Sequence, residues 1–538
     1  KISSLYSRTD PIDLEGSLAG LMESIIPLLE AARRNNVFVN FDMEQFELKD
    51  LTLELFMRCC EKVEFDGGIA MQAYLRSGDD DARRIIEWSQ RTGRQVTVRL
   101  VKGAYWDFET ISAEQEGWPV PVWSHKPDTD ACFERMTHAF IAATPVDVGQ
   151  GGVKLALGSH NARSIGAALA ALERRDLPSK ALELQMLYGM GGELKAAAVA
   201  MGIRLREYVP VGEMIPGMAY LVRRLLENTS NESWLKAGFL DDVSDDKLIQ
   251  SPHRRFSSDP GIDRIEKAPE RHQLSRRVEE LGEGRPFFTE PMRDFSDAHQ
   301  REAFKDAISR AVVPQIANDK TVEQTVAAVD RLEKSFPAWR DTPCIERAGV
   351  LMRAAAIMRD RRDELSGIII RENGKPWRDA DAEVCEAIDF CEYYAREATA
   401  LFEPQRLGRF IGEIDDTWYQ PRGVTAVISP WNFPVQLTFG PLAGILAAGN
   451  RAMIKPSEFT VETSELMKNV FAEEFDEEEV AMFTGGPEVG SAFSRLPFDH
   501  LIFTGAMSVA KHVMKAAAEN LVPVTLELGG KSPVIIGR

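Results

Sequence analysis

Two adjacent arginines have the chemistry to bind a carboxylate. Arg223 and Arg224 occur in the segment YLVRRLLEN, at the start of a predicted helix. Guanidinium groups suit carboxylates because their donors are planar and can form two parallel hydrogen bonds. Adjacent helical positions point about 100° apart, so both arginines can contact one ligand only if the site wraps around that end of the helix. The alternative is an ordinary basic helix face.

Other polar side chains stand at the ends of predicted strands in the first half of the chain. They are Asp42, Gln72, Arg99 with Lys102, His160, Gln185, and Arg206 with Tyr208. The carboxyl ends of the strands form the active-site face of a barrel, so polar groups gathered there indicate catalysis or ligand binding. Loop charges in solvent are the alternative, and agreement over several strands makes it the weaker one.

Seven apolar runs alternate with long amphipathic stretches up to about residue 230. They are residues 1–3 (the end of a strand), 36–42, 67–74, 95–105, 153–160, 182–190 and 204–212. This alternation, with nearly continuous apolar strands, predicts a parallel sheet covered on both faces, either a barrel or a doubly wound sheet. Seven strands are one short of a (β/α)8 barrel, so we expect a barrel over residues 1–228 whose first strand lies upstream of Lys1.

A second α/β domain is predicted over residues 301–538, after a polar, proline-containing connecting region at 229–300. Amphipathic helices are expected at 321–340 and 346–373, followed by apolar runs at 423–434, 449–458, 478–486, 500–506 and 522–536. The alternation of these strands with helices predicts a doubly wound sheet of the Rossmann type.

The composition excludes several classes of protein. Hydrophobic residues are 44% and charged residues 27% of 538, unlike collagen-like or disordered chains. The 64 Lys and Arg against 83 Asp and Glu give a net charge of −19, which argues against nucleic-acid binding by these residues. No apolar run reaches the roughly 20 residues of a membrane span, and no signal peptide is visible.

The cysteines predict neither a disulfide framework nor a zinc site. They lack CxxC spacing and are Cys59, Cys60, Cys132, Cys344, Cys385 and Cys391. We therefore expect no metal and a reducing, cytoplasmic compartment. The chain opens on Lys1 without an initiator Met and stops inside an apolar run at Arg538, so we expect it to be truncated at both ends.

The second half carries the motifs SPWNFP, IKPSE, FTGA and LELGGKSP, in that order. They resemble the aldehyde dehydrogenase superfamily over roughly residues 301–538. The resemblance implies that an aldehyde is oxidised by thiolate attack, hydride transfer to a nicotinamide and thioester hydrolysis. It implies that Asn432 donates to the oxyanion and that Glu527 is the general base. In isolation, each would be an ordinary loop residue.

The same resemblance implies a dinucleotide site. It assigns the adenosine ribose to Lys455 and Glu458, and the phosphate side to Gly485, Gly490, Phe503, Thr504 and Gly505. The residue after FTG is usually Ser and is Ala506 here, which removes a hydroxyl donor and would weaken cofactor affinity. We expect NAD rather than NADP, because Glu458 would face the 2′-phosphate and no Arg lies in IKPSEFTVE.

The catalytic cysteine of this superfamily follows the LELGG glutamate by a few dozen residues, beyond Arg538. None of the six cysteines matches its motif, so none is nominated. We expect these 538 residues to show no NAD reduction with an aldehyde.

The first half carries QAYLRSG, VRLVKGAYWD, LYGMG and REYVPVGEMIPGMAYLVRRLLEN, after the opening KISSLY. These motifs resemble the proline dehydrogenase family, and both halves together resemble the bifunctional proline utilization A family. The resemblance implies FAD-dependent oxidation of L-proline to pyrroline-5-carboxylate at the barrel. It further implies NAD-dependent oxidation of the hydrolysed product, glutamate semialdehyde, to L-glutamate at the second domain.

By this resemblance the proline carboxylate pairs with Arg223 and Arg224, with Lys1 as a third cation, and Asp42 is an active-site carboxylate. Substrate-pocket positions are matched by Tyr105, Leu187, Tyr208 and Tyr220. Flavin-contacting positions are matched by Gln72, Arg99, Lys102, Gly103, Trp106, Ser124, Lys126, His160, Gln185 and Glu227. Without the motifs, the aromatic residues would more often be core and His160 a buried structural histidine; no second His or Cys at ligand spacing supports a metal.

Three alternatives remain open. The chain could be a single-activity proline dehydrogenase with a nonfunctional aldehyde dehydrogenase-like scaffold, or a flavin-binding regulatory protein. A flavin barrel with another substrate, as in methylenetetrahydrofolate reductase, is disfavoured by the Arg223–Arg224 pair. The expected partners are small-molecule substrates, a quinone acceptor reached by peripheral membrane association, and further copies of the chain in a homo-oligomer.

Overall fold

The computed structural model describes residues 1–147, 149–213, 215, 217–218, 222, 249–254, 278–312, 321–408 and 410–537. The chain divides into two compact units. The first comprises Lys1–Ala268 with Phe295–Asp297, and the second comprises Pro269–Asp294 with Ala298–Arg538.

The first unit contains a six-stranded parallel sheet whose strands are adjacent in chain order. The strands are β1 (Val39–Phe41), β2 (Gly67–Gln72), β3 (Gln95–Val101), β4 (Gly152–Gly158), β5 (Glu183–Leu187) and β6 (Arg204–Tyr208). All six residues of β2 are buried, as expected of a strand covered on both faces. Consecutive parallel order is the order of a (β/α)8 barrel, and the six apolar runs predicted between residues 36 and 212 are confirmed as strands.

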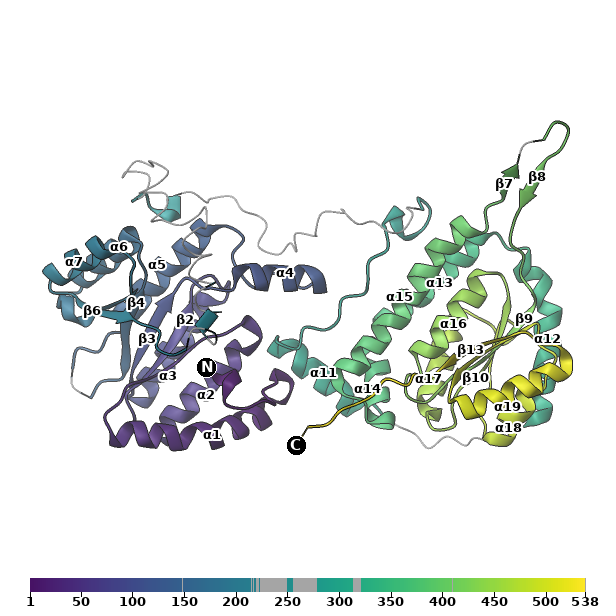
Figure 1. The fold of residues 1–538 in the computed structure, drawn as a ribbon, viewed down its shortest axis with the longest axis horizontal. Helices are drawn as coiled ribbons and strands as arrows, with labels where there is room; N and C mark the ends of the chain where they lie inside the picture. Colours follow the sequence, from purple (N-terminus) through teal and green to yellow (C-terminus); the bar gives the residue numbers. More distant parts are fainter. Residues whose placement is uncertain are drawn as a thin grey trace. The chain divides into compact units, whose positions relative to one another are not determined.

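Among the described residues of the first unit, one α-helix precedes β1 and the others follow strands of the sheet. They are α1 (Leu14–Arg34), α2 (Lys49–Lys62), α3 (Gly78–Thr92), α4 (Trp106–Glu116), α5 (Lys126–Ala142), α6 (Ala162–Glu173) and α7 (Gly192–Ala200). Helix α3 has three aspartates in its first turn, where the helix dipole stabilises negative charge. It ends at Gly93, which adopts the left-handed conformation (φ 69°). Helices α2, α3 and α5 pack against strands of the sheet (Figure 1).

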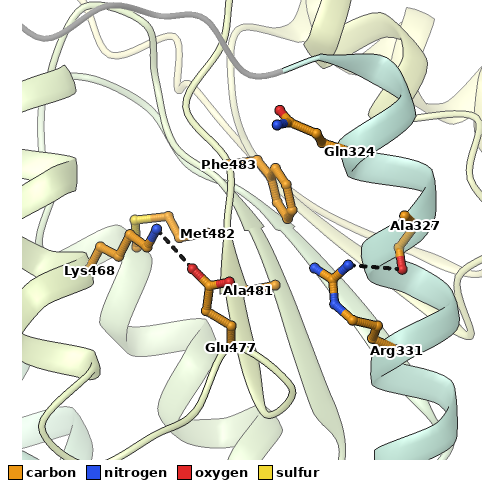
Figure 2. Close-up of a pocket in the computed structure, with 8 residues that line it drawn as sticks. All are labelled: Gln324, Ala327, Arg331, Lys468, Glu477, Ala481, Met482 and Phe483. Atoms are coloured by element: carbon orange, nitrogen blue, oxygen red, sulfur yellow. Dashed lines mark hydrogen bonds and ion pairs between the residues drawn. The ribbon is translucent and has the colours of Figure 1, made fainter.

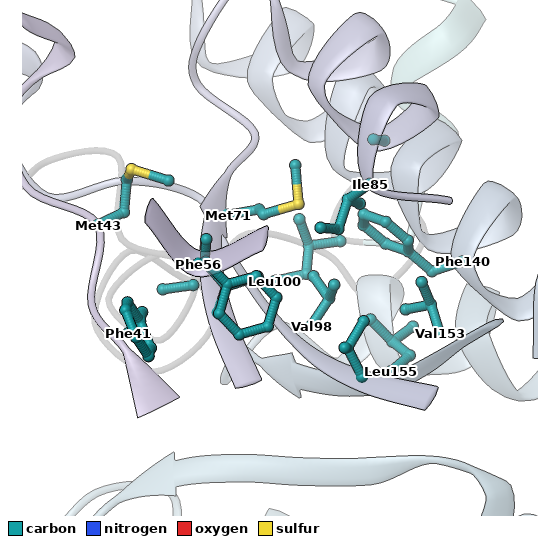
Figure 3. Close-up of a cluster of buried hydrophobic side chains, with 14 of the residues drawn as sticks. Phe41, Met43, Phe56, Met71, Ile85, Val98, Leu100, Phe140, Val153 and Leu155 are labelled. Atoms are coloured by element: carbon teal, nitrogen blue, oxygen red, sulfur yellow. The ribbon is translucent and has the colours of Figure 1, made fainter. Parts of the chain in front are cut away.

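A continuous apolar core fills the space between this sheet and its helices. Figure 3 shows part of it: Phe41, Met43, Phe56, Met71, Ile85, Val98, Leu100, Phe140, Val153 and Leu155. Phe56 of α2 is fully buried and meets Phe41 edge to face, with ring centroids 5.3 Å apart. The core holds the carboxyl ends of the strands in fixed register.

The expectation that the chain opens on the end of a strand is wrong. Residues Ile2–Ser4 form a short 3-10 helix, η1. Only Ile2 of this turn is buried. The backbone N–H of Ser3 donates to the side chain of Glu44, so it is not used in a strand ladder.

The second unit begins with helices. They are α11 (Ala298–Arg310), α12 (Val322–Arg340), α13 (Cys344–Asp360), α14 (Arg362–Asn373) and α15 (Trp377–Leu401). A capping box of Thr321 and Gln324 starts α12. The helix predicted over 346–373 is two helices, because the backbone turns at Arg361. The 25-residue helix α15 was not predicted.

The five predicted strands of the second unit are confirmed. They are β9 (Val424–Ile428), β10 (Arg451–Lys455), β11 (Val480–Met482), β12 (His500–Gly505) and β13 (Val524–Leu528). They form a parallel sheet in the order β11-β10-β9-β12-β13, which is the 3-2-1-4-5 order of a Rossmann sheet. Chain order reverses between β9 and β12, and ligands bind beyond the carboxyl ends of strands at such a point.

Helices α16 (Gln436–Ala447), α17 (Val461–Phe471), α18 (Pro487–Phe493) and α19 (Met507–Ala517) connect these strands. A separate antiparallel hairpin, β7 (Gln405–Gly408) with β8 (Asp415–Thr417), projects from the second unit in Figure 1. This hairpin was not predicted.

Candidate active sites

The predicted cation Lys1 and the predicted substrate-pocket residue Tyr105 lie together. Lys1 Nζ donates to the Tyr105 hydroxyl (3.1 Å) and lies 4.0 Å from Oε1 of Glu44. Glu44 is buried and accepts hydrogen bonds from the backbone N–H (3.0 Å) and the hydroxyl (2.7 Å) of Ser3. Glu44 therefore anchors the start of the chain beside Tyr105. Glu44 was not predicted from the sequence, and its place just after β1 is the signal that could have indicated it.

Gln72, a predicted flavin contact, carries a buried atom without a partner. Its Nε2 donates to the backbone oxygen of Glu44 (3.3 Å), but its Oε1 has no hydrogen-bond partner among the described residues. A buried acceptor without a donor costs about 1–3 kcal/mol, so this atom points to a ligand that carries an N–H or O–H group. Another predicted flavin contact, Gly103 (φ 133°), passes so close to the Tyr74 ring that a Cβ would lie 2.4 Å from it. The unpartnered acceptor of Gln72 fits a flavin, which carries ring N–H and ribityl hydroxyl donors.

One aspartate gathers two of the predicted flavin cations. Asp130 of α5 pairs with Lys102, and Lys126 Nζ lies 2.7 Å from its Oδ2. Burial acts to raise the pKa of Asp130, but the two ammonium groups together lower it. Burial also lowers the pKa of Lys102, against the attraction of Asp130. Two cations on one carboxylate leave positive charge for a diphosphate. Asp130 was missed, although its (i, i+4) spacing from Lys126 was visible.

The predicted active-site carboxylate Asp42 forms an ion pair with Arg99 of β3. This contact joins the residue after β1 to a residue inside β3, 57 positions away in sequence. The predicted flavin contact Trp106 donates from Nε1 to the backbone oxygen of Trp123 (2.8 Å), the residue before Ser124. The structure thus brings Trp106 and Ser124 into one neighbourhood.

Residues at the ends of β4 and β5 form a second group. The backbone N–H of Leu187 donates to Nε2 of His160 (3.2 Å), which fixes that ring nitrogen as an acceptor. The side-chain amide of Gln185 donates to Oε1 of Glu183 (2.8 Å). Tyr208, at the end of β6, is 50% exposed. His160 follows β4, Leu187 and Tyr208 end β5 and β6, and Gln185 lies in the middle of β5.

Four predicted site residues lie outside the described residues: Tyr220, Arg223, Arg224 and Glu227. Within the described part of the chain, no group of three His, Cys, Asp or Glu side chains could hold a metal ion.

In the second unit, the predicted ribose residues meet at the end of β10. Lys455 is buried, and its Nζ donates to the backbone oxygen of Pro456 (2.9 Å) and lies 3.3 Å from Oε2 of Glu458. Burial lowers the pKa of Lys455, which Glu458 opposes. A Cβ on Gly490 would lie 3.7 Å from Cε of Lys455, so the predicted phosphate loop passes beside this lysine. The backbone at Gly485 is also tight, since a Cβ there would lie 2.9 Å from Val489.

The other predicted dinucleotide residues end strand β12. Phe503 is buried and pairs in register with Ile428 of β9, while Thr504 pairs with the predicted base Glu527 on β13. Gly505 closes the strand. Ala506 then stands at the N-cap of α19, which receives no side-chain hydrogen bond. Serine is a preferred N-cap residue, so Ala506 costs this helix a cap as well as a hydroxyl donor.

The predicted oxyanion donor Asn432 lies in the loop after β9. Lys455 pairs in register with Ile428, the last residue of β9, so the ribose residues and this loop leave neighbouring strands. The backbone oxygen of Asn432 accepts a hydrogen bond from Lys375 (2.8 Å), and that of Trp431 accepts one from Asn373 (2.9 Å). Neither Lys375 nor Asn373 was predicted, because they lie more than 50 residues from the loop.

None of the six cysteines has the environment of a nucleophile. All are unbridged, and all but the half-buried Cys344 are buried. Burial raises the pKa of Cys385 and of Cys391 to about 12. Since the thiolate is the reactive form, these thiols are inert near neutral pH.

A cavity of about 270 Å³ lies beside the edge strand β11 (Figure 2). Gln324, Ala327, Arg331, Lys468, Glu477, Ala481, Met482 and Phe483 line it. Lys468 and Glu477 form an ion pair across part of it (3.0 Å). No predicted site residue lines this cavity.

Two protein families match the chain, one for each half. Residues 3–237 match proline dehydrogenase, and residues 296–538 match the aldehyde dehydrogenase family.

Whole-chain relatives carry both families. The bifunctional protein PutA of Salmonella typhimurium is 27% identical over all of this chain, which spans 43% of that protein. The crystal structure of proline utilization A (PutA) from Bdellovibrio bacteriovorus inactivated by N-propargylglycine superposes with a TM-score of 0.85 at 35% identity. That match covers 98% of this chain and 57% of the other.

One relative matches a shorter stretch more strongly. A probable coniferyl aldehyde dehydrogenase of Caulobacter vibrioides is 73% identical over 135 residues, which are 25% of this chain and 28% of that protein.

The chain thus spans about half the length of its PutA relatives. Their match over the whole chain confirms the predicted fold class, a proline dehydrogenase barrel followed by an aldehyde dehydrogenase-type Rossmann domain. The protein is therefore PutA-like, with a proline dehydrogenase half followed by an aldehyde dehydrogenase half.

Proposed function

We propose that this protein oxidises L-proline to L-glutamate in two steps. The observation that carries the proposal is the presence of both family matches on one chain, in the order found in PutA proteins. The first step is FAD-dependent oxidation of proline to pyrroline-5-carboxylate. The second is NAD-dependent oxidation of glutamate semialdehyde, which forms when the first product is hydrolysed.

In the first half, Arg223 and Arg224 would pair with the proline carboxylate, with Lys1 as a third cation. The contact of Lys1 with Tyr105 supports this placement, since it joins a cation to the proposed aromatic wall of the pocket. Tyr208, Tyr220 and Leu187 would complete the wall and exclude water, with Asp42 as a further polar group.

The flavin accepts a hydride from proline when it is bound; the chain supplies its binding site. The residues proposed to hold it are Gln72, Arg99, Lys102, Gly103, Trp106, Ser124, Lys126, His160, Gln185 and Glu227. The unpartnered Oε1 of Gln72 would accept from a flavin N–H or hydroxyl group. Lys102 and Lys126 would balance the diphosphate, with Asp130 holding both.

In the second half, the side-chain amide of Asn432 would donate to the oxyanion that forms when a thiolate attacks the aldehyde. Glu527 would take the proton from the water that hydrolyses the thioester. NAD accepts the hydride when bound. Lys455 and Glu458 would bind its ribose, and Gly485, Gly490, Phe503, Thr504 and Gly505 would approach its phosphates.

The two family matches do not favour a single-activity enzyme with a nonfunctional scaffold, nor a regulatory flavoprotein. They are compatible with a second candidate for the aldehyde substrate of the second half. The 73% identity of a quarter of the chain to a probable coniferyl aldehyde dehydrogenase makes coniferaldehyde a second candidate substrate beside glutamate semialdehyde. The ratio of kcat/KM for coniferaldehyde to that for glutamate semialdehyde, measured with the full-length protein, separates the two.

Other parts of the proposal concern organisation. We propose a barrel over residues 1–228, a connecting region over 229–300 and a dinucleotide domain over 301–538. In the parts of the chain that the structure describes, every helix is too short or too polar to cross a bilayer. Peripheral contact with a membrane quinone, a cytoplasmic location and a homo-oligomer complete the proposal.

Proline-dependent reduction of a dye by the FAD-loaded chain tests the first step. Arg224→Met should raise the KM for proline and leave bound flavin unchanged. Loss of one partner of a charge-assisted pair costs about 1.5–3 kcal/mol, roughly ten- to a hundredfold in apparent affinity. Flavin that binds but is never reduced by proline would refute the proposal, and an unchanged KM would refute the role of Arg224.

A further inference from the structure

The segment Glu372–Glu383, which ends α14 and begins α15, contacts two regions that are separated in sequence. One is the oxyanion loop, residues 431–436, which carries Asn432. The other is the start of α17, which directly follows the ribose residues Lys455 and Glu458. Helix α14 packs against α17 and α15 packs against α16 (Figure 1).

Two side chains of the segment bind the backbone of the oxyanion loop. Nδ2 of Asn373 donates to the backbone oxygen of Trp431 (2.9 Å), and Nζ of Lys375 donates to that of Asn432 (2.8 Å). Lys375 Nζ also lies 3.5 Å from the centre of the Phe433 ring, a cation–π contact. Three consecutive loop residues are therefore held from one side.

Glu383 holds the end of the same loop. Its Oε1 accepts from the backbone N–H groups of Val435 (2.7 Å) and Gln436 (3.4 Å), at the start of α16. Val435 is the N-cap of α16 and has no polar side chain, so Glu383 supplies the missing cap from another helix. Glu383 pairs with Lys375 (2.6 Å), and their side chains are 0% and 9% exposed. Removing both charges from water costs free energy, so we interpret this buried ion pair as fixing the positions of Lys375 and Glu383 rather than as stabilising the fold.

Glu372 makes the corresponding contacts on the cofactor side. Its carboxylate accepts from the backbone N–H groups of Glu462 and Thr463 (2.9 Å each) and from the Thr463 hydroxyl (2.5 Å). The N-cap of α17, Thr460, makes no side-chain cap, so Glu372 again replaces a local cap. The loop from Lys455 to α17 is thereby fixed at both ends, by the sheet and by Glu372.

We propose that Glu372, Asn373, Lys375 and Glu383 are positioning residues that set the oxyanion donor and the ribose-binding loop at a fixed separation. Lys375 and Glu383 act on Asn432, and Glu372 acts on Lys455 and Glu458. The positioning role rests on the function proposed above, whereas the contacts themselves do not.

Hydrogen exchange on the present chain tests the contacts independently of activity. The double variant Lys375→Met with Glu383→Gln avoids leaving one buried charge unpaired, and the introduced amide oxygen can still accept from the Val435 N–H. The double variant should speed amide exchange in residues 431–439 and leave exchange in residues 461–464 unchanged. Glu372→Ala should speed exchange in residues 461–464 and leave residues 431–439 unchanged. The control, Lys305→Met, removes a lysine from the exposed Glu302 pair (3.6 Å) on α11 and should change neither. Exchange that rises equally in both loops in either variant would overturn the proposal.

Kinetics of the full-length protein test the positioning role. The double variant should lower kcat for the aldehyde about ten- to a hundredfold, while KM for NAD changes less than about twofold. Glu372→Ala should raise KM for NAD and leave kcat nearly unchanged. If the double variant does not fold, Asn373→Ala, which removes only the contact to Trp431, should lower kcat in the same direction. The positioning role would be refuted if the variants changed hydrogen exchange in separate regions but did not divide their kinetic effects between kcat and KM for NAD. A wild-type protein inactive with every aldehyde would instead refute the proposed function.

Discussion

At the scale of single residues, the choice of nicotinamide depends on Glu458. Its carboxylate lies 3.3 Å from Lys455 Nζ at the end of β10, where an adenosine ribose binds in a Rossmann sheet. The 2′-phosphate of NADP would meet a like charge there. We predict a lower Kd for NAD than for NADP, measured by calorimetry on this chain. Glu458→Gln keeps the shape and should narrow the difference; an equal or tighter NADP affinity in the wild type would contradict this assignment.

Asp389 predicts a pH dependence of stability. Burial raises its pKa to about 6, against the hydrogen bond from the Glu290 backbone N–H (2.6 Å). A raised carboxyl pKa means that the folded state binds the proton more tightly than the unfolded state. Its contribution to stability is therefore present at low pH and is lost as pH rises from about 4 to about 6.

Asp389→Asn removes this titration and keeps an acceptor for Glu290. Since Asp389 is only partly buried, the difference should be about 1 kcal/mol. We expect the free energy of unfolding of the variant, relative to wild type, to rise between pH 4 and pH 6 and then to stay level. Urea unfolding at several pH values measures it, and a difference that falls over this range would contradict the stated cause.

At the scale of elements, the first unit depends on packing between α2 and the sheet. Phe56 is fully buried between Phe41 and Trp88, with ring centroids 5.3 and 6.1 Å away. Phe56→Ala should cost about 3–5 kcal/mol of stability, because it leaves a cavity in the core. Chemical denaturation followed through bound flavin would show it. A loss below about 1 kcal/mol would mean that the sheet and α2 are not a single packed unit.

The strands were predictable where burial leaves a local pattern. Strands β2 and β10 are buried along their whole length, so they appear in the sequence as unbroken apolar or mixed runs bounded by turns. Residues 1–3 were wrongly predicted to end a strand, because a single buried isoleucine resembles the end of such a run. Helix α15 was missed, although its buried residues recur at helical spacing, because charged residues interrupt them.

The site was predictable only through its motifs. Asn432 follows β9, Lys455 ends β10 and Glu527 is the fourth residue of the five-residue strand β13. All three belong to recognisable motifs, and the parallel strands place their carboxyl ends at one edge of the sheet. The partners Glu44 and Glu383 were missed because each acts on residues far away in sequence, and the spacing of Asp130 from Lys126 did not reveal its contact with the distant Lys102. The spacing of residues along the sequence does not indicate contacts that arise only when distant segments fold together.

At the scale of the whole molecule, the chain matches relatives of two kinds. PutA of Salmonella typhimurium matches the whole chain at 27% identity and PutA of Bdellovibrio bacteriovorus matches 98% of it at 35%, whereas a quarter of the chain matches a probable coniferyl aldehyde dehydrogenase at 73%. The central claim is that both halves serve one two-step conversion, so it concerns the fate of a single substrate rather than either activity alone.

The most direct test follows ¹³C-labelled L-proline by NMR in the full-length protein with FAD, an electron acceptor and NAD. The account predicts labelled L-glutamate, with one NADH formed for each proline consumed. Label that stops at pyrroline-5-carboxylate, in protein that still oxidises coniferaldehyde, would contradict the two-step claim and assign the second half to another aldehyde.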